Sequence, residues 1–214
     1  MNFSHIIWDF NGTILDDVKT CIECINEMLL KRNIPVLLGY EDYYRHFKFP
    51  IIDYYKSVGF DFDKEPFDDV LAPEWVDLYL KKVKDAKIRE GALEAINVFS
   101  KYGLKQVVIS ATEYCMLKKQ LTDLKIVNLF DDFIGLDNIH AKSKIELSKN
   151  WFACEKPKKA LFIGDTLHDL EVANSLSCDC VLISGGHQSE ETLKSKCKNV
   201  FSDYKNIINY VVNC

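Results

Sequence analysis

Short apolar runs alternate along this chain with longer segments in which apolar residues recur every three or four positions. The apolar runs lie at 5–10 (HIIWDF), 105–110 (KQVVIS), 160–164 (ALFIG) and 179–183 (DCVLI). The helical patterns lie at 93–102, 115–124, 142–153 and 167–176. Strands that are apolar on both faces belong to buried parallel sheets, which carry helices on both sides. The alternation therefore predicts an α/β fold.

The interval 16–88 breaks this alternation. It contains helical patterns at 18–32 and 73–86, separated by stretches rich in Pro, Gly and Asp, and no comparable apolar run. We expect an all-helical insertion here, with the sheet formed by residues 1–15 and 89–214. Because the insertion follows the first strand directly, it should cover the carboxyl ends of the strands, where open α/β sheets bind ligands.

The composition is that of an ordinary globular protein, with 48% hydrophobic and 28% charged residues among 214. A net charge of −5 disfavours a nucleic-acid partner, because phosphate contacts need clustered Lys and Arg. No apolar run approaches the roughly 20 residues that span a bilayer, and the first residues lack the basic segment of a signal peptide. We expect a cytoplasmic protein, a monomer or a dimer, that binds neither nucleic acid nor membrane.

Eight cysteines are scattered along the chain, partly within helical patterns. Because no export signal accompanies them, reduced thiols are expected. Cys21 and Cys24 lack a second ligand pair at zinc-like spacing, so we interpret them as neighbours on one helix face.

Acids, a serine and a lysine stand at the carboxyl ends of the predicted strands or at the start of the following helix. They are Asp9 in WDFNGT, Ser110 in VVISAT, Lys144 in AKSKIEL, and Asp165 with Asp169 in FIGDTLHD. A carboxylate can accept a phosphoryl group as a nucleophile. Because two anions must then meet, a hard cation such as Mg²⁺ is needed, and Asp9 and Asp165 are the expected ligand pair. Asp165 and Asp169 also suit the start of the helix at 167–176, and both roles can hold at once.

Taken together, in this order and spacing, these motifs resemble the haloacid dehalogenase superfamily, specifically its phosphatase branch with a helical cap, similar to phosphoglycolate phosphatases. The resemblance covers essentially the whole chain, and D-x-x-G-T and G-D-T-x-x-D are its specific elements. It implies a Rossmann-like core, an aspartyl-phosphate intermediate on Asp9 and a small phosphorylated metabolite as substrate. It also implies Mg²⁺ held by Asp9, the backbone carbonyl of Asn11 and Asp165, with Asp169 acting directly or through water.

The phosphoryl group that is transferred carries negative charge on its oxygens, so donors and a positive charge must face it. The Ser110 hydroxyl, the backbone N–H groups of Ala111 and Gly12, and the Lys144 ammonium suit that need. Lys142 is the rival for the lysine role, and the family's usual spacing favours Lys144. A lysine between the two carboxylates would also keep both ionised.

Asn11 departs from the family pattern, in which the second residue after the nucleophile is an Asp that donates and then accepts a proton. Asn has no titrating proton near neutral pH, and loss of acid–base assistance costs about 10² to 10⁴ in rate. One interpretation is a phosphatase that is slow, or whose leaving group departs unprotonated, as from an acyl phosphate or a phosphoanhydride.

Two other interpretations of Asn11 stay open. One is a different reaction of the superfamily, such as phosphonoacetaldehyde cleavage or dehalogenation, although dehalogenation needs no metal pair. The other is a catalytically impaired protein that binds a phosphorylated ligand or partner. We favour the slow or specialised phosphatase.

The segment 43–60 is dense in aromatic residues and carries Arg45 and Lys48. By resemblance it faces the active site, where these two bases could bind a polar leaving group and the aromatics could stack on one. Alternatively, the aromatics form the small core of the insertion and the bases are solvated. His187 could supply the missing proton but is expected on a surface loop, and Asp16 and Asp17 are expected to cap the next helix.

Overall fold

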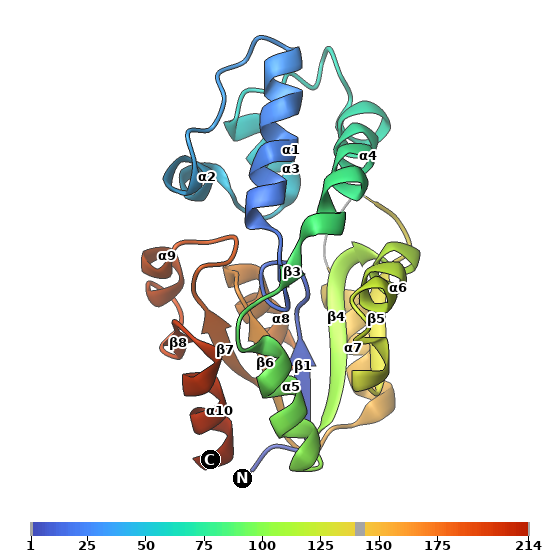
Figure 1. Ribbon diagram of the computed structural model, residues 1–214, viewed down its shortest axis with the longest axis vertical. Helices are drawn as coiled ribbons and strands as arrows, with labels where there is room; N and C mark the ends of the chain where they lie inside the picture. Colours follow the sequence, from blue (N-terminus) through green and yellow to red (C-terminus); the bar gives the residue numbers. More distant parts are fainter. Residues whose placement is uncertain (1, 140–143, 214) are drawn as a thin grey trace.

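A six-stranded parallel sheet forms the centre of the protein, whose computed structural model describes residues 2–139 and 144–213 (Figure 1). The strand order is β5-β4-β1-β6-β7-β8. The first strand therefore lies in the middle of the sheet, and His5 pairs with Lys105 on one side and Ala160 on the other. The strands are β1 (His5–Trp8), β4 (Lys105–Glu113), β5 (Asp132–Leu136), β6 (Ala160–Gly164), β7 (Asp179–Ile183) and β8 (Val200–Phe201).

Helices cover both faces of the sheet because successive side chains of β1 point to opposite sides. Ile6 and Trp8 pack with α5 (Ala92–Lys101), α6 (Tyr114–Asp123) and α10 (Tyr204–Asn213). Ile7 packs on the other face, with α7 (Ile145–Glu155), α8 (Leu167–Ser175) and α9 (Glu190–Lys194). The predicted α/β fold with a Rossmann-like sheet is confirmed.

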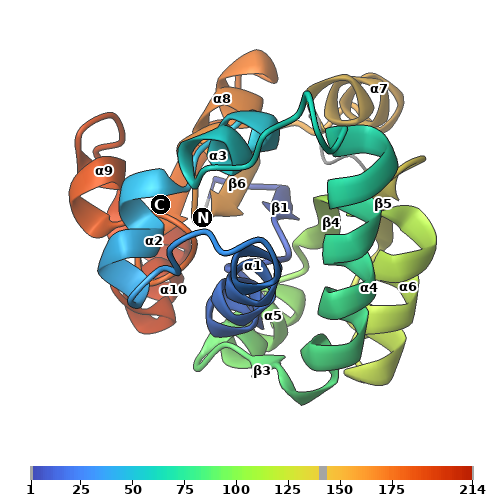
Figure 2. The same ribbon diagram turned by 90° about the horizontal axis from the view of Figure 1, so that it is seen from above.

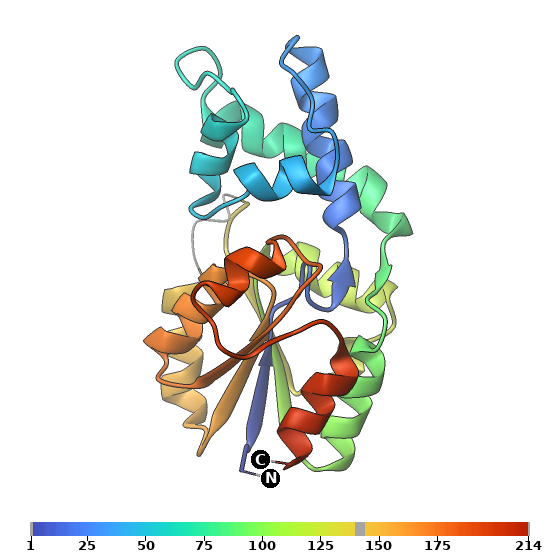
Figure 3. The ribbon, with the colours of Figure 1, turned by 90° about the vertical axis from the view of Figure 1, so that its left-hand side faces the viewer.

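A helical cap lies above the carboxyl ends of the strands (Figures 1 and 3). Its helices are α1 (Val18–Lys31), α2 (Tyr40–His46), α3 (Ile51–Ser57) and α4 (Ala72–Lys82), with a π-helical turn at Phe67–Leu71 and a 3₁₀ turn at Val83–Asp85. The cap has its own core of buried residues, which includes Met28, Tyr43, Tyr55 and Leu71. Figure 2 shows α3 on the side of α8 and α4 on the side of α6. The helical cap predicted from the sequence is thereby confirmed.

The cap joins the sheet domain through a two-stranded antiparallel ribbon. Strand β2 (Leu15–Asp16) pairs with β3 (Lys87–Ile88), so the chain enters and leaves the cap side by side. The helical patterns gave no indication of these two short strands. We propose that the ribbon marks the boundary between the units 1–15 with 89–214 and 16–88.

Strands β5 and β8 were also missed by the pattern of apolar runs. β5 (DFIGL) contains Asp132 and Gly135, and β8 has only two residues, so neither forms an uninterrupted apolar run. Both lie at edges of the sheet, where a strand pairs on one side only and needs less continuous apolar character. In the part of the chain that is described, no helix is long and apolar enough to cross a membrane.

An ion-pair network holds the far end of the cap. Arg32, at the end of α1, donates to Glu65 through Nε at 2.5 Å and Nη2 at 2.7 Å, and to Glu74 at 2.5 Å. The Arg32 side chain is only 11% exposed. Burial alone would raise the pKa of Glu74, but hydrogen bonds from Arg32 and Lys31 lower it, and Arg32 likewise lowers the pKa of Glu65. The network ties the start of α4 to α1.

Candidate active site

Three neighbouring strands bring the predicted site residues to one edge of the sheet. Asp9 directly follows β1, Ser110 lies within β4, and Asp165 directly follows β6. Since β4, β1 and β6 are adjacent, their carboxyl ends meet beneath the cap. The Asp9 backbone N–H donates to the carbonyl of Ile163 at 2.8 Å, which fixes the nucleophile candidate against β6.

Lys144 lies between two of the carboxylates. It is only 2% exposed and pairs with Asp9 Oδ1 and, at 2.8 Å, with Asp169 Oδ1. Its ammonium also donates to the carbonyl of Ile109 at 3.1 Å. Of the two lysines weighed for this role, Lys144 is therefore brought into the cluster, whereas Lys142 lies outside the described residues.

The cluster carries more negative than positive charge. Burial raises the pKa of Asp9 to about 8, and the charges of Asp169 and Asp165 add to this, although Lys144 opposes it. Burial also raises the pKa of Asp165. The pKa of Asp169 is lowered, because Lys144 outweighs the effect of burial. The charges of His187 and Arg89 oppose the effect of burial on Asp165, but its pKa is still raised, so the cluster suits a further cation.

The donor set fits a hard divalent cation. Asp9, Asp165 and Asp169 each offer a carboxylate oxygen, and these oxygens lie within 4.8 Å of one another. Mg²⁺ prefers such oxygen ligands and binds through one or two carboxylates while keeping water. Asp169 Oδ2 already accepts hydrogen bonds from the Asp165 and Thr166 N–H groups and the Thr166 hydroxyl. Asp9 and Asp165 are therefore the better direct ligands.

The Asp165 carboxylate accepts hydrogen bonds from the turn after β1 and from the loop after β7. Thr13 Oγ1 donates to its Oδ1 at 2.9 Å, and the His187 backbone N–H donates to its Oδ2 at 2.6 Å. Gly12 has a φ of +71°, and a Cβ there would clash with the Asp165 carboxylate and the His187 ring. Thr166 and Asp169 form a capping box at the start of α8. The predicted helix-capping role of Asp169 therefore coexists with its place in the cluster.

Ser110 and Thr112 connect the cluster to Asn11. The Ser110 hydroxyl, 1% exposed, donates to Thr112 Oγ1 at 3.0 Å and accepts from the Thr112 N–H at 3.0 Å. Thr112 in turn donates to Asn11 Oδ1 at 2.7 Å. Ser110 and Ala111 both line the cavity between core and cap. Both therefore lie where the sequence predicted phosphate-binding groups.

Asn11 uses its side-chain amide within the protein. Its Nδ2 donates to Asp17 Oδ2 and lies 2.7 Å from the Tyr79 hydroxyl, while its Oδ1 accepts from Thr112. Both ends of the amide are thus engaged. Position 11, where the resemblance implied an acid, is thus occupied by a hydrogen-bonding group with no titrating proton near neutral pH.

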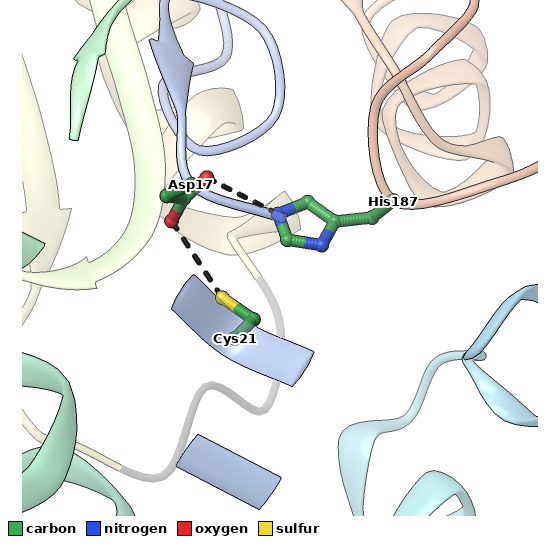
Figure 4. Close-up of side chains that lie close together, drawn as sticks. All are labelled: Asp17, Cys21 and His187. Atoms are coloured by element: carbon green, nitrogen blue, oxygen red, sulfur yellow. Dashed lines mark hydrogen bonds and ion pairs between the residues drawn. The ribbon is translucent and has the colours of Figure 1, made fainter. Parts of the chain in front are cut away.

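Asp17 was wrongly interpreted as a simple helix cap. Its side chain makes no cap hydrogen bond to α1 and is fully buried in the site instead. It accepts from the Gly12 N–H at 2.9 Å and from the Tyr79 hydroxyl at 2.6 Å. Cys21 Sγ lies 3.7 Å from it, as Figure 4 shows. A helix-capping pattern cannot distinguish an acid that faces the helix from one that turns into the core.

His187 was likewise wrongly expected on a surface loop. It is 6% exposed, and its Nε2 lies 3.5 Å from Asp17 Oδ1 (Figure 4). Its Nδ1 lies 2.7 Å from the Tyr43 hydroxyl. Its ring also stacks on Phe47, with centroids 5.0 Å apart. Burial would lower the pKa of His187, but Asp17 raises it to about 9. The histidine therefore links the loop after β7 to the cap.

The cap closes over a cavity of about 160 Å³. Its lining includes Asp9, Lys144 and Asp165 from the core and a set of aromatic side chains mostly from the cap. Arg45 and Lys48, predicted to meet the leaving group, are not among the described lining residues. Both are exposed, and Arg45 pairs with Asp42 at 2.8 Å. The alternative, in which Tyr43 and Tyr54 belong to the cap core, agrees with their burial.

A buried lysine among carboxylates, at the carboxyl edge of a capped parallel sheet, defines an α/β protein with an acidic, cation-suited centre. The chain belongs to the haloacid dehalogenase-like hydrolase family, whose model matches residues 6–183. The resemblance to the phosphatase branch of this family, predicted from the motifs, is confirmed.

Individual relatives agree with this assignment. The chain is 22% identical over 208 residues to a phosphoglycolate phosphatase from Pseudomonas putida. This match covers 92% of the chain and 75% of the relative. Among solved structures, a haloacid dehalogenase-like family protein from Streptococcus pneumoniae matches with a TM-score of 0.84 and 14% identity over 98% of both chains. A predicted phosphatase from Clostridium acetobutylicum matches with a TM-score of 0.79 and 18% identity over 99% of both chains. At these identities the structural matches show the fold alone.

Proposed function

We propose that this protein is a Mg²⁺-dependent phosphatase that acts on a small phosphorylated metabolite through an aspartyl phosphate on Asp9. The observation that carries the proposal is the position of Asp9, which ends the central strand on the wall of the cavity and pairs with the buried Lys144. Membership of the hydrolase family and the phosphoglycolate phosphatases among its relatives support the same class of reaction.

The chain's own residues divide the work. A carboxylate oxygen of Asp9 forms a bond to phosphorus as the bond from phosphorus to the leaving oxygen breaks, and water then releases phosphate and restores the carboxylate. Lys144, the Ser110 hydroxyl and the Ala111 N–H group would hold the phosphoryl oxygens. The Gly12 N–H, predicted for the same role, already donates to Asp17 Oδ1. Mg²⁺, held by Asp9, Asp165 and the Asn11 carbonyl, would neutralise charge between nucleophile and phosphate. Asp169 would position Lys144 and Asp165.

Asn11 sets the character of the proposed reaction. Its amide cannot protonate a leaving oxygen near neutral pH, and both of its ends are already engaged by Asp17, Tyr79 and Thr112. His187, which also lines the cavity, is engaged at both ring nitrogens by Asp17 and the Tyr43 hydroxyl. Efficient turnover is therefore restricted to leaving groups that depart as anions. The same observation supports the second candidate function, a catalytically impaired member of the family that binds a phosphorylated ligand or partner.

Hydrolysis of p-nitrophenyl phosphate and acetyl phosphate, with Mg²⁺ and with EDTA, separates these two functions. The phosphatase releases phosphate from both compounds only when Mg²⁺ is present, and the Asp9→Asn variant releases none. Absence of turnover in the wild type, together with Mg²⁺-dependent binding of orthovanadate, would instead establish the binding protein. The exposed variant Asp123→Asn is a matched control, because it removes one acid far from the cluster.

A further inference from the structure

The wall of the cavity that faces Asp9 is predominantly aromatic. The aromatic lining residues are Tyr43, Phe47, Phe49, Tyr54, Tyr55, Phe67, Trp75 and Tyr79. Of these, Phe47, Phe49 and Trp75 are only half-buried. Ile51, Val76 and Met116 complete this wall. Such a wall favours a flat apolar group over a hydrated one.

The charges around the cavity disfavour an anionic leaving group. Among the described lining residues, Lys144 is the one lysine or arginine, and it is already paired with Asp9 and Asp169. The imidazole of His187 also lines the cavity, and its two ring nitrogens are engaged by Asp17 and the Tyr43 hydroxyl. Asp17 and Glu113 add negative charge to the lining. Burying a carboxylate without a partner cation is costly. A leaving group such as glycolate, whose carboxylate would need a cation in the cap, is poorly matched to this wall.

The absence of an acid at position 11 limits the leaving group independently. A phenol has a pKa of about 10 and leaves readily as an anion. An alkyl alcohol has a pKa like that of water, about 16, and needs a proton as it leaves. The amide of Asn11 supplies no proton. A phenol as leaving group therefore suits both the aromatic lining of the cavity and the lack of a general acid.

The dimensions and the remaining polar groups suit a single ring. The cavity measures about 160 Å³, and an apolar cavity of about 150 Å³ holds benzene. Two buried polar atoms of the lining, the Tyr54 hydroxyl and His168 Nε2, have no hydrogen-bond partner within the described chain. His168 also stacks on Phe49, with ring centroids 4.6 Å apart.

We propose that the substrates are aryl phosphates, monoesters of phosphate with a small, uncharged phenol, in which the ring binds the aromatic wall and the phenolate departs without a proton. The inference rests on the proposed phosphatase function. The Asp9 oxygen bonds to phosphorus as the bond from phosphorus to the phenolic oxygen breaks with its electron pair. The released phenolate is protonated by water, and a second water molecule cleaves the aspartyl phosphate.

Four substrates separate the effect of the ring from that of the leaving group. Phenyl phosphate has both the ring and a good leaving group, benzyl phosphate the ring alone, acetyl phosphate a good leaving group alone, and phosphoglycolate neither. With Mg²⁺, kcat/KM is expected to be highest for phenyl phosphate, at least about 100-fold above benzyl phosphate, and lowest for phosphoglycolate. Turnover of phosphoglycolate or benzyl phosphate equal to that of phenyl phosphate overturns the inference and leaves the phosphatase function intact.

Variants of the aromatic wall test the role of the ring. Trp75→Ala and Phe49→Leu should each raise KM for phenyl phosphate about tenfold, and should raise KM for acetyl phosphate, which has no ring, much less. Phe49→Leu keeps an apolar side chain of similar size and so guards against misfolding of Trp75→Ala. Tyr102→Ala, which removes a 52% exposed aromatic residue, is the matched control. An equal loss of kcat/KM for phenyl phosphate and acetyl phosphate overturns the inference. If the wild type turns over none of the substrates, both the inference and the phosphatase function are rejected.

Discussion

The side-chain amide of Asn11 donates a 2.7 Å hydrogen bond to the carboxylate of Asp17. Asp17 is completely buried and also accepts from the Gly12 N–H and the Tyr79 hydroxyl. Burial would raise the pKa of Asp17, yet the contact with His187 and the hydrogen bonds from Tyr79 and Asn11 lower it. The amide of Asn11 can therefore donate to an ionised Asp17, whereas an ionised acid at position 11 could not.

The Asn11→Asp variant should gain activity and lose stability. Two carboxylates at this distance cannot both be ionised, so one of them holds a proton that can be given to a leaving oxygen. Turnover of benzyl phosphate should rise by about 10-fold or more, while that of phenyl phosphate changes little. The free energy of unfolding at pH 7 should fall by about 1–3 kcal/mol, as measured by urea denaturation.

The double variant Asn11→Asp with Asp17→Asn is the matched control for the single one. It restores one acid and one amide to the pair, so it should recover part of the lost stability. If the single variant is as stable as the wild type and no faster on benzyl phosphate, then the proton is handled elsewhere.

Asp9→Asn should abolish turnover but not folding. The substitution removes the proposed nucleophile, and the remaining activity should be at most about 10⁻³ of the wild type. It also removes one of three crowded acids, so stability in EDTA should be equal or higher. Added Mg²⁺ should raise the unfolding midpoint of the wild type much more than that of the variant. A variant with wild-type turnover would exclude Asp9 as nucleophile.

Lys144→Met should be strongly destabilising because it leaves Asp9 and Asp169 without their buried partner. Breaking a buried ion pair on one side costs about 3–5 kcal/mol, and phosphate release should be lost as well. Lys149→Met on helix α7, which begins directly after Lys144, is the control, since Lys149 is 47% exposed and pairs with Glu146 at the surface. Equal stability of the two variants would contradict the central position of Lys144.

Arg32→Met should destabilise the cap in a pH-dependent way. Arg32 lowers the pKa of Glu65 and of Glu74 below their ordinary value of 4.5, so the stabilisation is complete above that pH. It is lost as the pH falls through the lowered values and both acids take up protons. The variant should be about 1–3 kcal/mol less stable at pH 7, with a difference that shrinks below about pH 4.5. Denaturation at several pH values measures this, and a difference independent of pH would show that packing alone is lost.

Much of the fold follows from apolar periodicity. The strands predicted at 160–164 and 179–183 are confirmed without change, because continuous apolar runs occur only where both faces of a strand are buried. The ribbon of β2 and β3 escaped prediction, since two-residue strands have no periodicity. Its pairing depends on contacts between residues more than seventy positions apart.

The candidate site divides in the same way. Asp9 and Asp165 could be located because they end strands that lie together in the sheet, whereas the roles of Asp17 and His187 depend on side-chain direction. Both are buried, and each contacts a cap tyrosine that is distant in sequence, Tyr79 for Asp17 and Tyr43 for His187. Arg45 and Lys48 show the converse, because a basic residue in the right segment can still point to solvent.

Because Leu15 pairs with Ile88, the chain enters and leaves the cap at the same place. The whole segment between these two residues is an insertion whose ends lie side by side. Its length and sequence can therefore vary at little entropic cost to the core. In the proposed function, the residues of the phosphoryl chemistry lie outside this segment, and most of the aromatic wall lies within it. Exchange of the segment between the paired residues for that of a relative would be expected to transfer substrate preference while leaving the carboxylates and the lysine in place.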